Sequence, residues 1–175
     1  IFTSSRRQPG AANRGDESLT SYYRMYEVTC QEDSTSGAFM FGNRPRVFAP
    51  MLHSRFHTGP AAFYKSGTWM VYVATVDKAD EQGRRTSGLH FATLGKRGWE
   101  HVSEFPFNSF DHSINAVTIA DDGSRLYFSA EMSGGHGGKD IYLSNWTGTT
   151  WSKPVNLGSS INTSKDESFP YAHED

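Results

Sequence analysis

The sequence is poor in cysteine, in net charge and in long apolar runs, and each shortage excludes a class of protein. With one cysteine in 175 residues, Cys30, no internal disulfide can form, and we expect a buried or half-buried thiol rather than a redox or metal centre. The 17 basic and 19 acidic residues are intermixed, so a nucleic-acid partner is not expected. No stretch approaches the roughly 20 apolar residues that cross a bilayer, so direct membrane insertion is not expected.

What the sequence does contain is a repeat of about 55 residues. Similar segments begin at His57 and His112 and lead into β-rich runs, and a third begins at Glu167. Self-similarity at a fixed period indicates one supersecondary unit used several times, each copy burying its faces against its neighbours. With 36% apolar and 14% aromatic residues and no helical period, we expect an array of β units.

Within each unit the pattern predicts four antiparallel strands. In the last complete unit, two β-prone runs flank a turn at Gly123, and two more strands follow a glycine-rich loop. The expected strands there are 115–120, 125–130, 140–145 and one around 151–157. In the preceding unit they are 61–64, 69–74, 89–92 and one around 99–105, and the chain opens with 1–4, 22–28 and 39–48.

This order predicts an all-β fold, specifically a β-propeller segment of about three four-stranded antiparallel blades, incomplete at both ends. The expected boundaries are a partial blade at 1–56, whole blades at 57–111 and 112–166, and the first strand of a further blade at 167–175. Closed propellers have about four to eight blades. We therefore expect a fragment of a longer chain, or a dimer that completes a six-bladed ring.

Several segments carry a family resemblance. Residues 126–129, 133–142, 151–158, 161–163 and 166–171 resemble the WD40-like propeller repeat of OmpA-family envelope lipoproteins of Bacteroidota, including the PorE-type component of the type IX secretion system. The similarity is dense over 116–171, weaker over 60–110 and faint before that. The first hairpin departs from the family's Ser-Pro-Asp-Gly pattern, since residues 120–123 read Ala-Asp-Asp-Gly.

The resemblance implies a function and a location. It implies a non-enzymatic scaffold for protein interaction in a periplasmic, outer-membrane-associated protein that takes part in type IX secretion. The partners would be other envelope or secretion-machinery proteins. In the family, peptidoglycan binding belongs to a separate domain, so it is not expected of this chain.

Three polar residues are equivalent under the repeat and form the candidate ligand site. His57, His112 and Glu167 each precede the first strand of a unit, which is innermost in a propeller, so they should lie near one rim of the channel. Two imidazoles and a carboxylate could hold a cation or an anionic group there. The alternative is that they bond to backbone groups of the connectors. His53 and His101 lie off this register and are expected at the surface.

No catalytic residue or cofactor is predicted. The glycine-rich loop at 133–138 leads into a strand rather than a helix, unlike a phosphate-binding loop. Residues 144–151 resemble the Asp box of sialidase-type propellers, but Trp146 occupies the position of the aspartate. A carbohydrate-active or carbohydrate-binding propeller of sialidase-like type is therefore the alternative function.

A cluster of phenylalanines gives a candidate partner-binding patch. Phe105, Phe107 and Phe110 lie in a connector interrupted by Pro106 and Asn108. If exposed, they would form an apolar surface suited to a protein partner. The alternative is that they pack beneath the connector.

Overall fold

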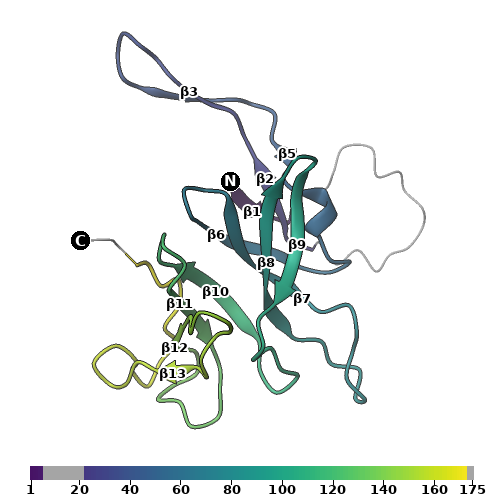
Figure 1. Cartoon of the computed structure of the whole chain (residues 1–175), viewed down its shortest axis with the longest axis vertical. Coiled ribbons are helices and arrows are strands. Elements are labelled where there is room, and N and C mark those ends of the chain that lie inside the picture. Colours follow the sequence, from purple (N-terminus) through teal and green to yellow (C-terminus); the bar gives the residue numbers. More distant parts are fainter. Residues whose placement is uncertain (6–21, 173–175) are drawn as a thin grey trace.

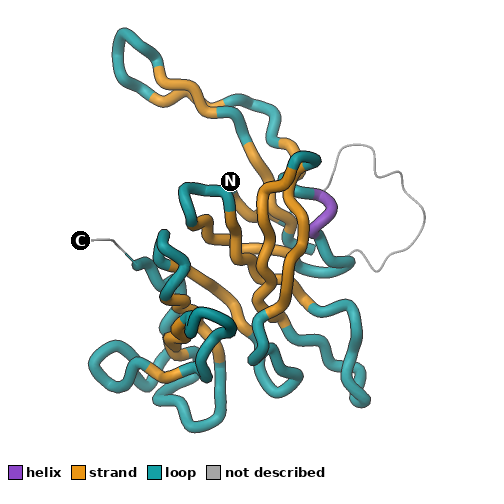
Figure 2. Tube along the Cα trace, viewed as in Figure 1, coloured by secondary structure: helices purple, strands orange, loops and turns teal. Residues whose placement is uncertain are grey.

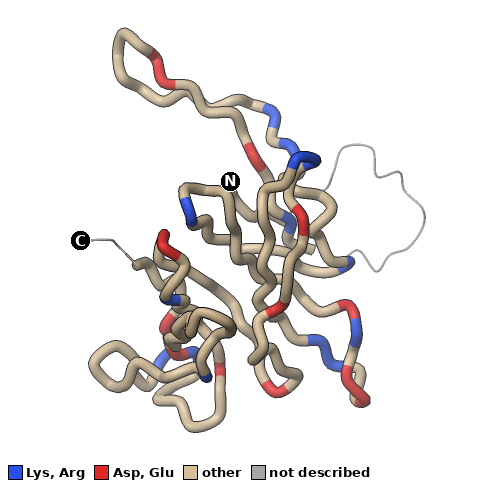
Figure 3. The backbone as a smooth tube through the Cα atoms, viewed as in Figure 1, with Lys and Arg blue, Asp and Glu red and all other residues tan. Residues whose placement is uncertain are grey.

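The computed structural model describes residues 1–5 and 22–172, which form an all-β fold, as predicted. The strands assemble into four antiparallel sheets joined by loops and turns (Figure 2). The described residues include one short 3-10 turn, η1 (Pro50–Leu52). In that part of the chain, no helix is long and apolar enough to cross a bilayer. Basic and acidic residues are scattered over the sheets and loops rather than gathered by sign (Figure 3).

Two of the sheets have four strands each, arranged in sequence order (Figure 1). The central sheet consists of β6 (Thr58–Tyr64), β7 (Trp69–Thr75), β8 (Ser87–Gly95) and β9 (Gly98–Glu104). The C-terminal sheet consists of β10 (Ile114–Ile119), β11 (Arg125–Ala130), β12 (Asp140–Asn145) and β13 (Val155–Asn156). The expected up-and-down order is therefore present in both sheets.

The central and C-terminal sheets also share irregular details at matching places. The first strand of each carries a β-bulge, between Thr58 and Ala61 in one sheet and between Ile114 and Ala116 in the other. The first hairpin of each turns through a glycine with positive φ, +75° at Gly67 and +76° at Gly123. The two sheets therefore have the same irregularities at corresponding positions.

The N-terminal sheet has three strands, in the order β1 (Phe2–Ser4), β2 (Arg24–Glu27) and β5 (Arg46–Val47). Between β2 and β5 the chain leaves the sheet as a separate hairpin, β3 (Cys30–Glu32) and β4 (Phe39–Phe41). This hairpin projects away from the rest of the chain (Figure 1).

The projecting hairpin corrects two predictions. Residues 39–48 are not one strand, because the Asp33 carboxylate accepts hydrogen bonds from the backbone N–H of Thr35 and Ser36 and stabilises a turn that pairs β4 with β3. Cys30 is exposed rather than buried, because every residue of β3 is exposed on the projecting hairpin.

The central sheet buries both of its faces in two separate cores. Alternate residues of β7 point to opposite faces, as the period of a strand requires. On one face, Met70 and Tyr72 pack with Met25 and Phe48 of the N-terminal segment. On the other, side chains including Val71 pack against the C-terminal sheet in a cluster that contains Leu89, Phe91, Phe105, Leu126, Phe128 and Trp151.

The end of the chain is less regular than expected. The predicted fourth strand around 151–157 reduces to β13, preceded by Pro154, which cannot donate to a ladder. Trp151 instead forms an isolated bridge with Trp146. Residues 167–172 of the predicted first strand of a further blade, 167–175, are not in a strand, and residues 173–175 lie outside the described residues.

Candidate functional site

The residues at the unit entries bond to the backbone of the preceding sheet. His57 Nδ1 accepts a hydrogen bond from the backbone N–H of Tyr23, with an N–N distance of 3.1 Å. The backbone N–H groups of Ser87 and Lys139, at the starts of β8 and β12, donate to Ser113 Oγ at 3.2 Å and Asp166 Oδ1 at 3.0 Å. At each of the three connectors, a polar side chain thus accepts a hydrogen bond from the backbone of the preceding sheet.

These three donors occupy equivalent positions in their sheets. Each lies two residues before a carbonyl that accepts a hydrogen bond from the residue directly after the last strand of its sheet. The pairs are Met25 with Phe48, Leu89 with Phe105, and Ile141 with Leu157. The structurally equivalent entry residues are therefore His57, Ser113 and Asp166. The sequence repeat, which aligned His57, His112 and Glu167, is shifted by one residue in the last two copies.

His112 and Glu167 have different surroundings. The Glu167 carboxylate accepts hydrogen bonds from the backbone N–H and the hydroxyl of Thr163, at 2.9 and 2.6 Å. His112 is half-buried, burial lowers the pKa of its imidazole, and its Nε2 has no hydrogen-bond partner. His57 and Glu167 therefore hydrogen-bond to backbone groups, as the alternative to a ligand site predicted. Within residues 1–5 and 22–172, these three residues are not among the groups close enough to share a metal ion.

The three phenylalanines do not form a single exposed surface. Phe105 is only 2% exposed, and its ring contacts those of Phe107, Phe128 and Trp151. Phe107 is partly buried against the same core, whereas Phe110 is 40% exposed. Phe105 and Phe107 therefore pack beneath the connector, as the alternative predicted. Of the three phenylalanines, only Phe110 lies at the surface.

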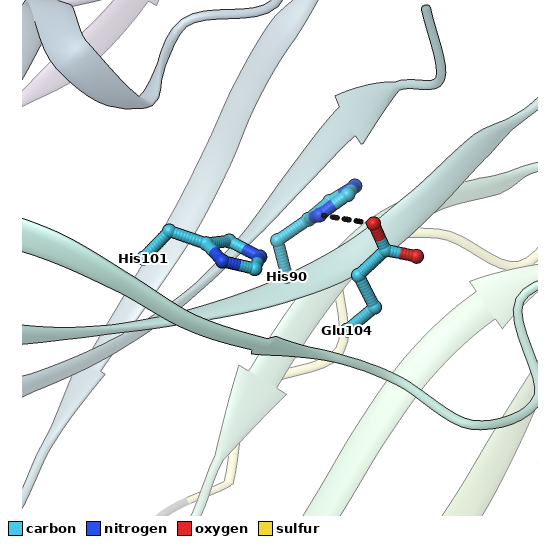
Figure 4. Close-up of side chains that lie close together, drawn as sticks. All are labelled: His90, His101 and Glu104. Carbon is cyan, nitrogen blue, oxygen red and sulfur yellow. Dashed lines mark ion pairs between the residues drawn. The ribbon is translucent and has the colours of Figure 1, made fainter. Parts of the chain in front are cut away.

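A second group of polar side chains lies on the face of the central sheet that packs against the N-terminal segment. His90 on β8 meets His101 and Glu104 on β9, and the three side chains gather on one side of these strands (Figure 4). His90 Nδ1 lies 3.9 Å from Glu104 Oε1, and the two imidazole centroids are 5.9 Å apart. One ligand atom from each residue lies within 4.8 Å of the other two.

A β-bulge brings His101 and Glu104 to the same face. Residues three apart on a regular strand point to opposite faces. In the register of β8 and β9, however, His90 pairs with Glu104 and Ala92 pairs with His101, with a shift between these two pairs. Because His90 and Ala92 are two residues apart and share a face, so do their partners.

The cluster opens into a cavity of about 600 Å³. The walls come from η1 and the residues after it, from β7 to β9, and from the loop after β9, and they include Met51, His53, Tyr72, Asn108 and Phe110. The Tyr72 ring stacks on His90 with centroids 5.4 Å apart and an interplanar angle of 28°. This stacking fixes the plane of the His90 imidazole in the cavity wall.

Burial controls the electrostatics of the cavity wall. Burial lowers the pKa of the His90 imidazole, and the Glu104 carboxylate opposes this effect. Burial, with a smaller effect of Glu104, raises the pKa of the Tyr72 phenol to about 12. Burial and the Arg24 guanidinium lower the pKa of His53 to about 4. The His53 and His90 imidazoles and the Tyr72 phenol are therefore neutral at pH 7.

This group was not predicted from the sequence, and the expected surface position of His53 was wrong. His53 is partly buried and its Nε2 has no hydrogen-bond partner, whereas His101 is exposed as predicted. The spacing of His101 and Glu104 did not predict the cluster, because residues i and i+3 of a regular strand point to opposite faces. Only the bulge in β9 brings the three residues together. Comparisons with protein-family models, with curated proteins and with solved structures found no match to this chain.

Proposed function

We propose that this chain is a segment of a WD40-like β-propeller that acts as a non-enzymatic scaffold for protein interaction. The observation that carries the proposal is the burial of both faces of the central sheet, one against the N-terminal segment and the other against the C-terminal sheet. Propeller blades are four-stranded sheets repeated around an axis, each with a neighbour on either side. The matching strand orders of the central and C-terminal sheets support the same architecture.

A repeated side-chain clip supports the interpretation of these sheets as successive blades. The Asn108 amide accepts a hydrogen bond from Leu89 N–H at 2.9 Å and donates to Leu89 C=O at 3.0 Å. Asn162 does the same with Ile141, at 2.8 and 3.0 Å. In each case the connector after the fourth strand is fastened to the start of the third strand.

The proposed location and partners rest on the resemblance over residues 116–171. We propose a periplasmic, outer-membrane-associated protein that binds envelope or secretion-machinery proteins of the type IX system. A protein partner also suits the projecting hairpin, on which Phe39, Met40 and Phe41 are 63%, 57% and 69% exposed. Exposed apolar groups of this kind mark protein-binding surfaces.

The test is a binding experiment with the hairpin varied. The chain is immobilised and exposed to an envelope extract from a bacterium with type IX secretion, and bound proteins are identified by mass spectrometry. We expect secretion-machinery proteins to bind, and to be lost with a Phe39→Ser and Phe41→Ser double variant but kept with Thr35→Ala on the same hairpin. Equal retention by all three chains would contradict a role for the hairpin.

A glycan panel separates the scaffold from the alternative function. Thermal stabilisation of the chain by a sugar, without capture of any envelope protein, would favour the carbohydrate-binding propeller instead. Light scattering addresses the dimer. A molar mass near twice 19.5 kDa would support two chains in a six-bladed ring, and a mass of 19.5 kDa would exclude it.

A further inference from the structure

We propose that His90, His101 and Glu104 form a three-ligand binding site for a divalent transition-metal ion, with Zn²⁺ as the best match. The three ligand atoms already lie within 4.8 Å of one another. Zinc bonds to histidine nitrogen and carboxylate oxygen are about 2.0–2.2 Å long, so tetrahedral ligands lie roughly 3.4 Å apart. His101 and Glu104 are exposed and close the remaining distance by side-chain rotation.

The backbone that carries the ligands is paired on both sides of the bulge in β9. β8 lies between β7 and β9 in the central sheet, and β9 pairs with β8 from Gly98 to Glu104. The ligands therefore come from two adjacent strands whose separation is fixed by their ladder. Sites built on strands hold ligand geometry better than sites built on loops.

The ring of His90 is held in place with Nδ1 toward Glu104 (Figure 4). The side chain is 12% exposed and stacks on Tyr72. The 3.9 Å separation of Nδ1 from Glu104 Oε1 is longer than a hydrogen bond. A cation held between these two atoms would give each of them a favourable contact.

The chemistry of the ligands selects the class of metal. Two imidazoles with one carboxylate suit zinc and its first-row neighbours, whereas magnesium and calcium prefer sets made of oxygen ligands. Three protein ligands leave one position open in a tetrahedral site. That position faces the cavity of about 600 Å³, where a water molecule or a group from another molecule can enter.

The experiment measures binding of Zn²⁺ alone to the 175-residue chain after chelation, by titration calorimetry and thermal unfolding. We expect one Zn²⁺ per chain and a raised melting temperature, with no effect of Mg²⁺. Loss of a partner outside the ligand set weakens metal sites about 10–100-fold, so loss of a ligand in His101→Ala or Glu104→Gln should weaken binding by about 100-fold or more.

Two matched variants serve as controls. Glu100 is exposed on β9 but pairs with Thr93, so it faces the opposite side of the sheet, and Glu100→Gln should bind Zn²⁺ normally. His136 is exposed on the glycine-rich loop, and His136→Ala should also bind normally. Because His101 and Glu104 are exposed, their variants should keep the circular dichroism spectrum of the parent chain.

Cobalt gives a readout that a merely structural role would not produce. Co²⁺ bound by the parent chain should show the intense visible absorption of a four- or five-coordinate site, and His101→Ala should lose it. Unchanged Zn²⁺ affinity in both His101→Ala and Glu104→Gln would overturn the proposal. So would a loss of binding caused by His136→Ala instead.

Discussion

At the scale of single residues, the Asn162 side chain hydrogen-bonds to the backbone of β12 as a neighbouring strand would. It is 1% exposed, and besides its two bonds to Ile141 its amide donates to Asn156 Oδ1 at 2.8 Å. Asn156 in turn donates to the buried carboxylate of Asp140 at 2.9 Å. One side chain therefore satisfies the backbone of β12 and joins a buried polar network.

We expect Asn162→Ala to destabilise the chain by about 2–4 kcal/mol, because it leaves buried backbone and side-chain groups without partners at about 1–3 kcal/mol each. Urea unfolding measures the change. Asn145→Ala, at an exposed position, is the control and should change the free energy of unfolding by less than about 0.5 kcal/mol. A similar effect of the two substitutions would show that the clip contributes little.

The half-buried histidines predict the response to acid. Burial lowers the pKa of His53 from 6.5 to about 4, and burial also lowers the pKa of His90 and His112. Between the lowered and ordinary values the unfolded chain binds more protons than the folded chain, so stability falls as pH falls. We expect a constant free energy of unfolding above about pH 7 and a steady decline from 6.5 toward 4.

Urea unfolding at pH 7 and pH 5, with a chelator present, tests this expectation. The decline should be smaller in His53→Gln, which removes one of the three titrating groups. An equal decline in this variant and the parent would mean that His53 does not contribute.

At the scale of elements, the two middle strands of the last unit were predictable, whereas its short fourth strand and the bulges were not. The runs 125–130 and 140–145 match β11 and β12, because alternating β-prone residues end at clear turn signals. The bulge in β9 follows from the pairing of β9 with β8 and has no signature of its own in the sequence. The phase of the repeat was wrong by one residue at His112 and Glu167, because the neighbouring residues Ser113 and Asp166 make the equivalent hydrogen bonds.

Substitution of Gly67 and Gly123, in the first hairpins of the two four-stranded sheets, tests how closely these hairpins pack. Both have positive φ, but a Cβ at Gly67 would meet nothing within 4 Å, whereas one at Gly123 would lie 3.0 Å from the buried Tyr64 ring. Gly67→Ala should cost about 1 kcal/mol of backbone strain. Gly123→Ala should cost more, because Tyr64 must move between two packed sheets.

Thermal unfolding of the two variants gives the comparison, and only the difference between them reports on packing. Equal melting temperatures would contradict close packing of the two hairpins. Two hydrogen bonds also join these hairpins. Lys65 N–H donates to Asp121 C=O at 2.7 Å, and Ser66 N–H donates to the Asp121 carboxylate at 3.1 Å.

At the scale of the whole molecule, the sheets share cores and should unfold together. Phe105 follows β9 yet packs with Phe128 and Trp151 of the C-terminal sheet. Phe105→Ala should therefore destabilise by about 3–5 kcal/mol without changing the number of unfolding transitions.

Phe110→Ala is the control, since Phe110 is 40% exposed, and it should cost less than about 1 kcal/mol. Two separate transitions in the parent chain would contradict a shared core. The continuous apolar run of β7 made a sheet buried on both faces foreseeable. The burial of Phe105 was not foreseeable, because it depends on the direction that the chain takes after β9.

The projecting hairpin has a practical consequence. Cys30 is the sole cysteine and is exposed on β3. A thiol-reactive dye should therefore attach once per chain without any engineered mutation, beside Phe41 at the base of the hairpin. Its emission would report encounters at the hairpin while leaving the packed sheets untouched.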